Sequence, residues 1–106
     1  MSTPLNDLGR FAEPALLILV ALAAGPKHGY AIMTEAESIS GVPMGPGTLY
    51  AALGRLERLG LIEALPAEDR RRPYRLTGAG ASNLEDQLRS LERLARTGLA
   101  RLSVEG

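Results

Sequence analysis

Side chains able to bind nucleic acid are concentrated in residues 44–62, MGPGTLYAALGRLERLGLI. At about 100° per residue, one side of a helix through this segment is leucine-rich, and the other combines very small residues with a tyrosine and two arginines. Hydroxyls and guanidiniums bind phosphates, and a guanidinium also binds a guanine edge. Small residues permit close approach, which favours insertion into the major groove of DNA. The predicted DNA-contacting residues are Thr48, Tyr50, Ala51, Arg55 and Arg58.

A second basic group follows in the segment 66–72, PAEDRRR. We predict that Arg70, Arg71 and Arg72 contact phosphates or the minor groove of DNA. The alternative is a solvated loop in which these arginines pair with Glu68 and Asp69. The same ambiguity applies to Arg75, which either contacts DNA or pairs with Glu63 across a hairpin. For Arg58 the alternative is the helix dipole, which favours a cation near a helix C-terminus.

The overall composition excludes several classes of protein. Twelve basic and twelve acidic residues cancel, but residues 55–77 hold six arginines against four acids, so the basic excess is local. The sequence has no cysteine and one histidine, which excludes disulfides, cysteine-based zinc sites and histidine-rich metal sites. No nucleophile–base pair or phosphate-binding loop is recognisable. We therefore expect no enzymatic activity, no cofactor and no metal.

The elements that must position these residues follow from periodicity and from glycine and proline. Tyr30 to about Ser38 predicts a helix, Ile39–Gly45 a turn, and the segment from Pro46 to Gly60 a second helix. Together they form a helix-turn-helix pattern. The residues predicted to face the core are Tyr30, Ile32, Met33, Ala36, Leu49, Ala52, Leu53, Leu56 and Leu59. His28 is predicted to be a turn residue.

The segments on either side complete a winged fold. Residues 61–65 and 73–77 predict two strands joined by the arginine-rich loop, and Thr77 is a suitable cap for a last helix. The predicted fold class is mainly α with a small two-stranded β wing: a winged helix-turn-helix plus a long C-terminal dimerisation helix. The predicted organisation is a flexible arm at 1–10, a DNA-binding domain at 11–77 and the dimerisation helix at 78–106.

Two apolar segments predict self-association. Residues 15–24, ALLILVALAA, are too short to cross a membrane. A signal peptide is disfavoured because Asp7 and Glu13 cancel the upstream positive charge. A helix apolar on all sides should be buried on all sides, which implies cover from a second subunit. Leucines at alternating spacings of four and three follow in residues 84–102. The predicted dimerisation residues are Leu16, Leu19, Leu84, Leu88, Leu91, Ala95 and Leu102.

Three sequence blocks resemble those of PadR-type transcriptional regulators: HGYAIM at 28–33, GTLYAALGRLERLGLI at 47–62 and DRRRPYRLTGAG at 69–80. The resemblance covers about residues 12–83, and the single C-terminal helix is similar to the compact subgroup of the family. It implies a homodimeric winged-helix repressor whose third helix reads the major groove. Glycines at 45 and 54, where the family commonly has a serine and a basic residue, remove two possible backbone contacts.

The leading functional hypothesis is therefore a cytoplasmic, sequence-specific DNA-binding repressor. Its expected partners are a second copy of the chain and a pseudo-palindromic operator in double-stranded DNA, and not a membrane. Some members of the family that this chain resembles release DNA on binding a small molecule, so a small hydrophobic or aromatic inducer is a further candidate partner. The alternative is a winged-helix protein-interaction module that does not bind DNA, which the net charge of zero favours.

Overall fold

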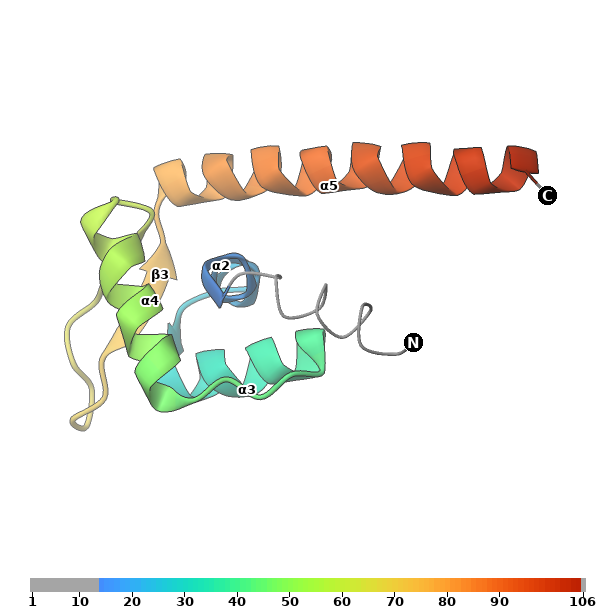
Figure 1. Cartoon of the computed structure of the whole chain (residues 1–106). Coiled ribbons are helices and arrows are strands. Elements are labelled where there is room, and N and C mark those ends of the chain that lie inside the picture. Colours follow the sequence, from blue (N-terminus) through green and yellow to red (C-terminus); the bar gives the residue numbers. More distant parts are fainter. Residues whose placement is uncertain (1–13, 106) are drawn as a thin grey trace.

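The computed structural model describes residues 14–105. The predicted arm at 1–10 lies outside these residues. The elements follow one another as α2 (Pro14–Ala23), β1 (Lys27–His28), α3 (Gly29–Ser40), α4 (Pro46–Arg58), β2 (Ile62–Ala64), β3 (Pro73–Leu76) and α5 (Gly78–Glu105). Figure 1 shows α2 between α3 and α5, with α4 and the strands at one end of the molecule. The predicted fold class, mainly helical with a winged helix-turn-helix and a long last helix, is confirmed.

The core is formed around α2, which carries no charged side chain. Ile18, Leu19 and Leu22 are buried against Ile32 of α3 and Leu53 of α4. Ala21 is also buried, but the remaining residues of α2 are only half-buried, except Ala23, which is exposed. A single chain therefore does not bury this helix on all sides, and its cover by a second subunit stays a prediction. No helix among the described residues is both long enough and apolar enough to cross a membrane.

Helix α4 begins and ends where the sequence predicted. Pro46 occupies the first turn, and Gly60 adopts a left-handed φ of 76° just beyond the C-terminus. Leu49, Ala52, Leu53 and Leu56 are buried as expected. Leu59 is not, because it lies after the last helical turn and its side chain is 63% exposed. The core position expected for Leu59 is taken by Ile62, which is 1% exposed.

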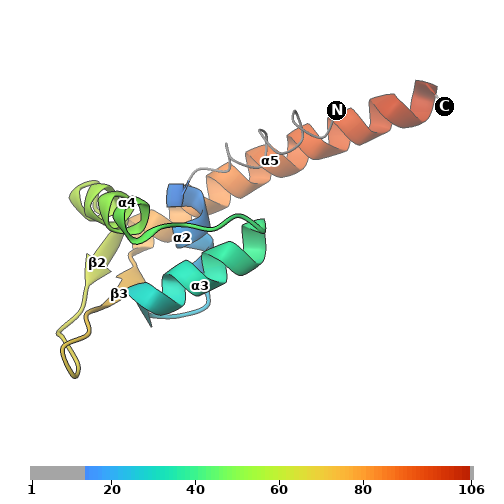
Figure 2. The same cartoon turned by 60° about the horizontal axis from the view of Figure 1, so that its bottom comes forward.

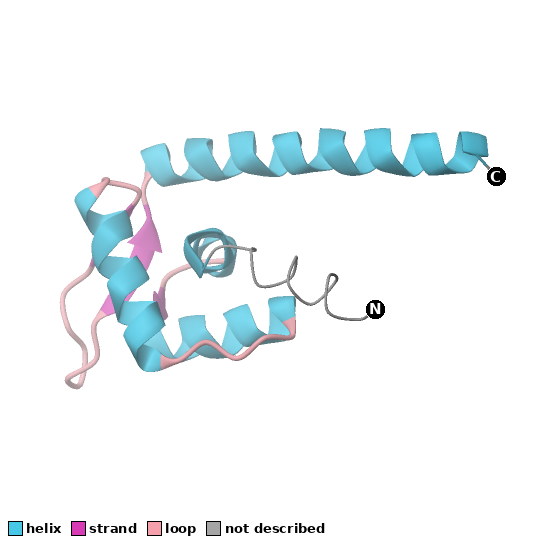
Figure 3. Ribbon diagram, viewed as in Figure 1, coloured by secondary structure: helices cyan, strands magenta, loops and turns pink. Residues whose placement is uncertain are grey.

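The sheet has three strands instead of the predicted two. β3 is the central strand and pairs antiparallel with β2 on one side and with β1 on the other (Figure 3). The prediction of a turn at His28 is wrong, because Lys27 and His28 pair with Tyr74 and Pro73. Two residues beside glycine and proline have no periodicity of their own, so this strand exists only through its partner.

The loop between β2 and β3 closes a hairpin. We call this loop and the two strands the wing. It projects from the body of the molecule (Figure 2). Glu68 and Arg71 exchange two backbone hydrogen bonds of 2.6 and 2.8 Å at its end. Asp69 and Arg70 form the two-residue tip with φ values of 48° and 68°. This is the left-handed geometry that two-residue hairpin turns of type I′ require.

Helix α5 starts at Gly78, directly after Thr77, as predicted. The Thr77 hydroxyl accepts a hydrogen bond of 3.0 Å from the Gly80 backbone N–H, which confirms Thr77 as its cap. The same hydroxyl donates to the Gly60 carbonyl over 2.7 Å and ties α5 to the end of α4. After the first turns α5 leaves the body, and it gives the molecule its length of 56 Å.

Candidate nucleic-acid interface

The outer face of α4 is exposed along its whole length. Thr48, Ala51, Arg55 and Arg58 all lie on it, as does Gly47 near the start of the helix. Gly54 is close to Arg58, since a Cβ at position 54 would lie 3.4 Å from the Arg58 Nη1 atom. The helix thus presents hydroxyl and guanidinium groups beside very small residues, and the Arg58 guanidinium lies next to Gly54.

Tyr50 lies at the edge of this face and leans toward α3. A Cβ built on Gly29 would meet the Tyr50 Oη atom at 2.6 Å, so the phenol rests directly on the glycine at the start of α3. The Tyr50 side chain is nevertheless 55% exposed. The phenol is therefore positioned by the helix-turn-helix while remaining accessible to a partner.

The three arginines of the wing are exposed and carry unneutralised charge. Within residues 14–105, Arg70, Arg71 and Arg72 form no ion pair, although Glu68 and Asp69 are adjacent in sequence. The alternative of local pairing therefore does not apply among these residues. Arg75 differs, because its guanidinium lies 2.5 Å from the Glu63 carboxylate on the neighbouring strand. This resolves the ambiguity at Arg75 in favour of the hairpin ion pair.

A cavity of about 400 Å³ lies between the wing and the start of α3, beside Tyr50 of α4. We call it the tyrosine pocket. It is lined by His28, Gly29, Tyr30, Tyr50, Arg70, Arg71, Arg72 and Tyr74. Four of its residues come from the predicted site, namely Tyr50 and the three wing arginines. No acidic residue is among the described residues that line it.

Tyr30 corrects a prediction from the sequence. It was expected in the core, but its side chain is 75% exposed. Because α3 begins at Gly29, position 30 lies in the first turn and faces outward, and Ile32 and Ala36 provide the buried side instead. His28, Tyr30 and Tyr74 were not predicted as site residues. The available signal was that the three blocks of the resemblance each contain a tyrosine.

Tyr74 is the least exposed tyrosine of the pocket. Burial raises the pKa of its phenol above the ordinary value of 10.0, and Glu57 and Tyr50 raise it further, while Arg72 acts in the opposite direction. Like any phenol at neutral pH, the Tyr74 hydroxyl is protonated and can donate a hydrogen bond. His28 has a buried Nδ1 atom without a hydrogen-bond partner among the described residues.

The predicted dimerisation residues divide into two groups. Leu19 and Leu84 are 1% and 5% exposed within one chain, so they belong to its core and not to a subunit contact. Leu16 is half-buried, and Ala95 is exposed. Leu88, Leu91 and Leu102 are also exposed, and Leu94 and Leu99 extend the same apolar stripe along α5.

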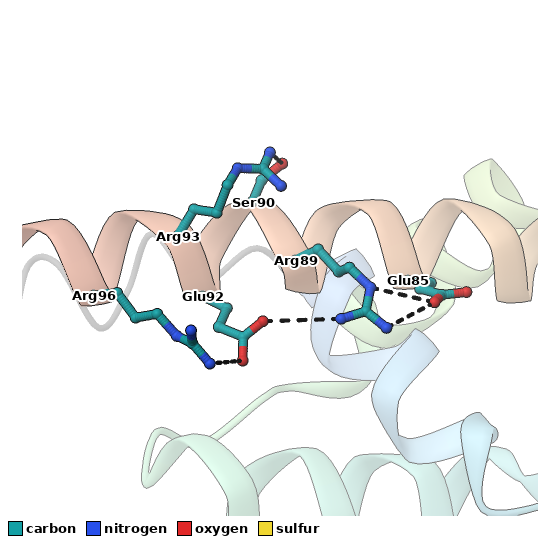
Figure 4. Close-up of polar contacts among 6 residues, drawn as sticks. All are labelled: Glu85, Arg89, Ser90, Glu92, Arg93 and Arg96. Atoms are coloured by element: carbon teal, nitrogen blue, oxygen red, sulfur yellow. Dashed lines mark hydrogen bonds and ion pairs between the residues drawn. The ribbon is translucent and has the colours of Figure 1, made fainter.

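A charged flank runs beside this apolar stripe (Figure 4). Glu85 pairs with Arg89 at 3.2 Å, Arg89 with Glu92 at 4.0 Å, and Glu92 with Arg96 at 3.2 Å. Where the flank meets the body, an open groove of about 590 Å³ separates α5 from the end of α2. Ala23, Leu76, Ala81, Leu84 and Leu88 provide its apolar lining.

Comparison with known proteins gives a consistent result. Residues 18–86 match the family described as "Transcriptional regulator PadR-like family". The transcriptional regulator Rv3488 of Mycobacterium tuberculosis is 44% identical over 88 residues, which cover 80% of this chain and 81% of that protein. An uncharacterised 37.1 kDa protein in transposon TN4556 of Streptomyces fradiae is 46% identical over 86 residues, covering 81% of this chain.

The chain spans only 25% of the length of the Streptomyces protein. Among solved structures, the fold is similar to a PadR family transcription regulator from Clostridium difficile R20291, with a TM-score of 0.74 and 25% identity. That match covers 81% of this chain and 94% of the other. The similarity thus extends over the winged helix-turn-helix and into the last helix.

Proposed function

Because this chain belongs to the PadR-like family of transcriptional regulators, and not to a family of enzymes, we propose that it is a homodimeric repressor that binds a pseudo-palindromic operator in double-stranded DNA. The observation that carries this proposal is the presence of exposed cationic groups on both α4 and the wing. Arg55 is exposed on α4, and Arg70, Arg71 and Arg72 line the tyrosine pocket together with Tyr50 of α4. The wing arginines form no ion pair within residues 14–105. The cytoplasm, where such DNA lies, is the proposed location.

In this proposal α4 enters the major groove. Gly47 and Ala51 permit the helix backbone to approach the bases, and Thr48 and Arg55 supply hydrogen bonds to base edges or phosphates. Since few side chains on this face can read bases, we propose that phosphate contacts and DNA shape supply much of the affinity. The wing then reaches the adjacent minor groove or the backbone with its arginines.

A dimer is supported by the exposed leucines of α5. Leu91, Leu94 and Leu102 are 48%, 69% and 70% exposed, and an isolated helix would leave this stripe in water. Pairing of α5 with a second copy, with Leu16 of α2 at the edge, would bury it. Two copies of α4 would then lie about one turn of DNA, roughly 34 Å, apart.

A small-molecule inducer is supported by the open groove beside α5. Its volume of about 590 Å³ lies within the range of small-molecule sites, and its apolar lining suits a hydrophobic or aromatic compound. Because the groove adjoins the apolar stripe, an occupant would bias how α5 packs and hence how far apart the two copies of α4 lie.

The proposal is tested by selecting DNA from a random pool and titrating the selected duplex at two salt concentrations. We expect a pseudo-palindrome whose binding weakens as salt rises, because phosphate contacts release counterions. Replacing Tyr50 and Arg55 together by Ala should weaken binding at least about tenfold. The change at Tyr50 removes a hydroxyl hydrogen bond to DNA, and the change at Arg55 removes a charge-assisted one.

The dimer of this double variant should remain folded, which light scattering and circular dichroism would verify. Binding that is insensitive to salt, or equal on scrambled DNA, would refute operator recognition. That outcome would favour the alternative of a winged-helix protein-interaction module.

A further inference from the structure

We propose that the tyrosine pocket binds one phosphate of the DNA backbone, in the strand that runs between the major and the minor groove. This inference rests on the proposed function and adds a specific site to it. Its residues beyond the predicted contacts are His28, Gly29, Tyr30 and Tyr74.

The first argument is the position of the pocket. Its walls come from the start of α3 and Tyr50 of α4 on one side, and from the wing on the other. If α4 occupies the major groove and the wing reaches the adjacent minor groove, a single backbone strand separates them. That strand must cross the space between α4 and the wing, which is where the cavity lies.

The second argument is the chemistry of the lining. Three guanidiniums provide positive charge and forked hydrogen-bond donors that match phosphate oxygens, and the described lining residues include no carboxylate. The hydroxyls of Tyr50 and Tyr74 are further donors. A phosphodiester has only acceptor oxygens to offer and fits such a set of donors.

The third argument is the start of α3. His28 is its N-cap residue, yet its side chain makes no capping hydrogen bond. The first-turn N–H groups of this 12-residue helix are therefore not capped by that side chain, and the helix dipole favours an anion there. The Tyr50 hydroxyl reaches this point because Gly29 has no side chain in its way.

A phosphate within duplex DNA suits the pocket better than a free small anion. Arg70, Arg71 and Arg72 are all exposed, so they do not enclose a bound group. A free anion would keep much of its water and gain little. A backbone phosphate is instead held in place by α4 and the wing on either side, so its effective concentration at the pocket is high.

The test uses the full chain and the selected duplex, with single phosphates replaced in turn by neutral methylphosphonates. We expect one position in each half-site at which replacement weakens binding about tenfold. In Tyr50→Phe, which loses only the hydroxyl, the penalty at that position should shrink while the penalties elsewhere persist. Arg93→Gln is a control far from the pocket, because Arg93 is exposed on α5 and, within residues 14–105, its side chain hydrogen-bonds to Ser90. It should leave the penalty unchanged.

A second measurement uses the fact that Tyr30, Tyr50 and Tyr74 are the only tyrosines of the chain and all line the pocket. In protein grown with 3-fluorotyrosine, every ¹⁹F resonance therefore reports on this site. We expect the intact duplex to shift the resonances and the methylphosphonate at the sensitive position to reverse the shift.

The outcomes separate the two proposals. If no selected duplex binds in a salt-dependent manner, the proposed function fails. If the duplex binds but no loss of affinity on methylphosphonate replacement depends on the Tyr50 hydroxyl, only the proposed phosphate site in the tyrosine pocket is refuted. Phenyl phosphate added without DNA provides the last arm. If it alone reproduces the ¹⁹F shifts at micromolar concentration, the pocket is a small-ligand site and the inference is overturned.

Discussion

Gly29 determines where the Tyr50 hydroxyl lies. The glycine is buried beneath the phenol, and its backbone does not need the conformational freedom of glycine, since its φ is not in the left-handed region. Space for Tyr50 is therefore the reason that a glycine suits this position. The Tyr50 hydroxyl is the far end of a side chain that is half-exposed, so it can move aside without disturbing the core.

Gly29→Ala should consequently separate stability from DNA binding. Alanine favours a helix by up to about 1 kcal/mol over glycine, so the melting temperature should stay constant or rise. DNA affinity should fall several-fold because the new methyl group displaces the Tyr50 hydroxyl. In a Tyr50→Ala background the same substitution should have no effect on affinity. Equal losses of affinity in both backgrounds would contradict this role of Gly29.

At the scale of elements, the junction between α4 and α5 is close-packed. Gly80, in the first turn of α5, lies so near the loop after α4 that a Cβ would meet the Leu61 carbonyl oxygen at 1.9 Å. Thr77 reinforces the junction through its bonds to Gly60 and Gly80. The direction in which α5 leaves the body is therefore determined by backbone contacts, which cannot yield as a flexible side chain can.

Gly80→Ala should destabilise the fold by at least about 2 kcal/mol, because overpacking against backbone forces α5 to shift. Urea denaturation followed by circular dichroism would measure the change. Gly78→Ala is the matched control, since a Cβ there has nothing within 4 Å, and it should be neutral or slightly stabilising. Similar free energies of unfolding for the two variants would contradict the proposed junction.

At the scale of the whole molecule, one end carries the DNA-facing groups and the other is a projecting helix. Figure 1 shows the C-terminal half of α5 extending beyond α2 and α3. Its charged flank is satisfied by ion pairs within the helix, from Glu85 to Arg96, and exposed pairs of this kind contribute little stability each. The leucine stripe beside it is the part of α5 that a partner would remove from water.

Leu91→Glu should convert the dimer to a monomer, because it places a charge in the middle of the stripe. Loss of two-site binding should lower operator affinity by about 100-fold or more. Light scattering after size-exclusion chromatography would give the mass. Thr97→Glu, which adds the same charge at an exposed position on another side of α5, should remain dimeric. A dimeric Leu91→Glu would show that the stripe is not the subunit contact.

Much of the fold was already determined by local signals in the sequence. Pro46 and Gly60 delimited α4, Thr77 capped α5, and the spacing of Leu49, Leu53 and Leu56 identified the buried side. These features act within a few residues of one another, so the sequence alone contains them. The same holds for the exposed face of α4 and for the concentration of arginine in the wing.

Only the tertiary structure decided which surfaces meet. It added Lys27 and His28 to the sheet, moved Tyr30 out of the core, and buried Leu19 and Leu84 within one chain. It also brought three tyrosines from separate elements to one cavity with the wing arginines. Periodicity shows that residues share a side of an element, but the contact made by that side depends on segments distant in sequence. For this reason the tyrosine pocket emerges from the fold and not from any one motif.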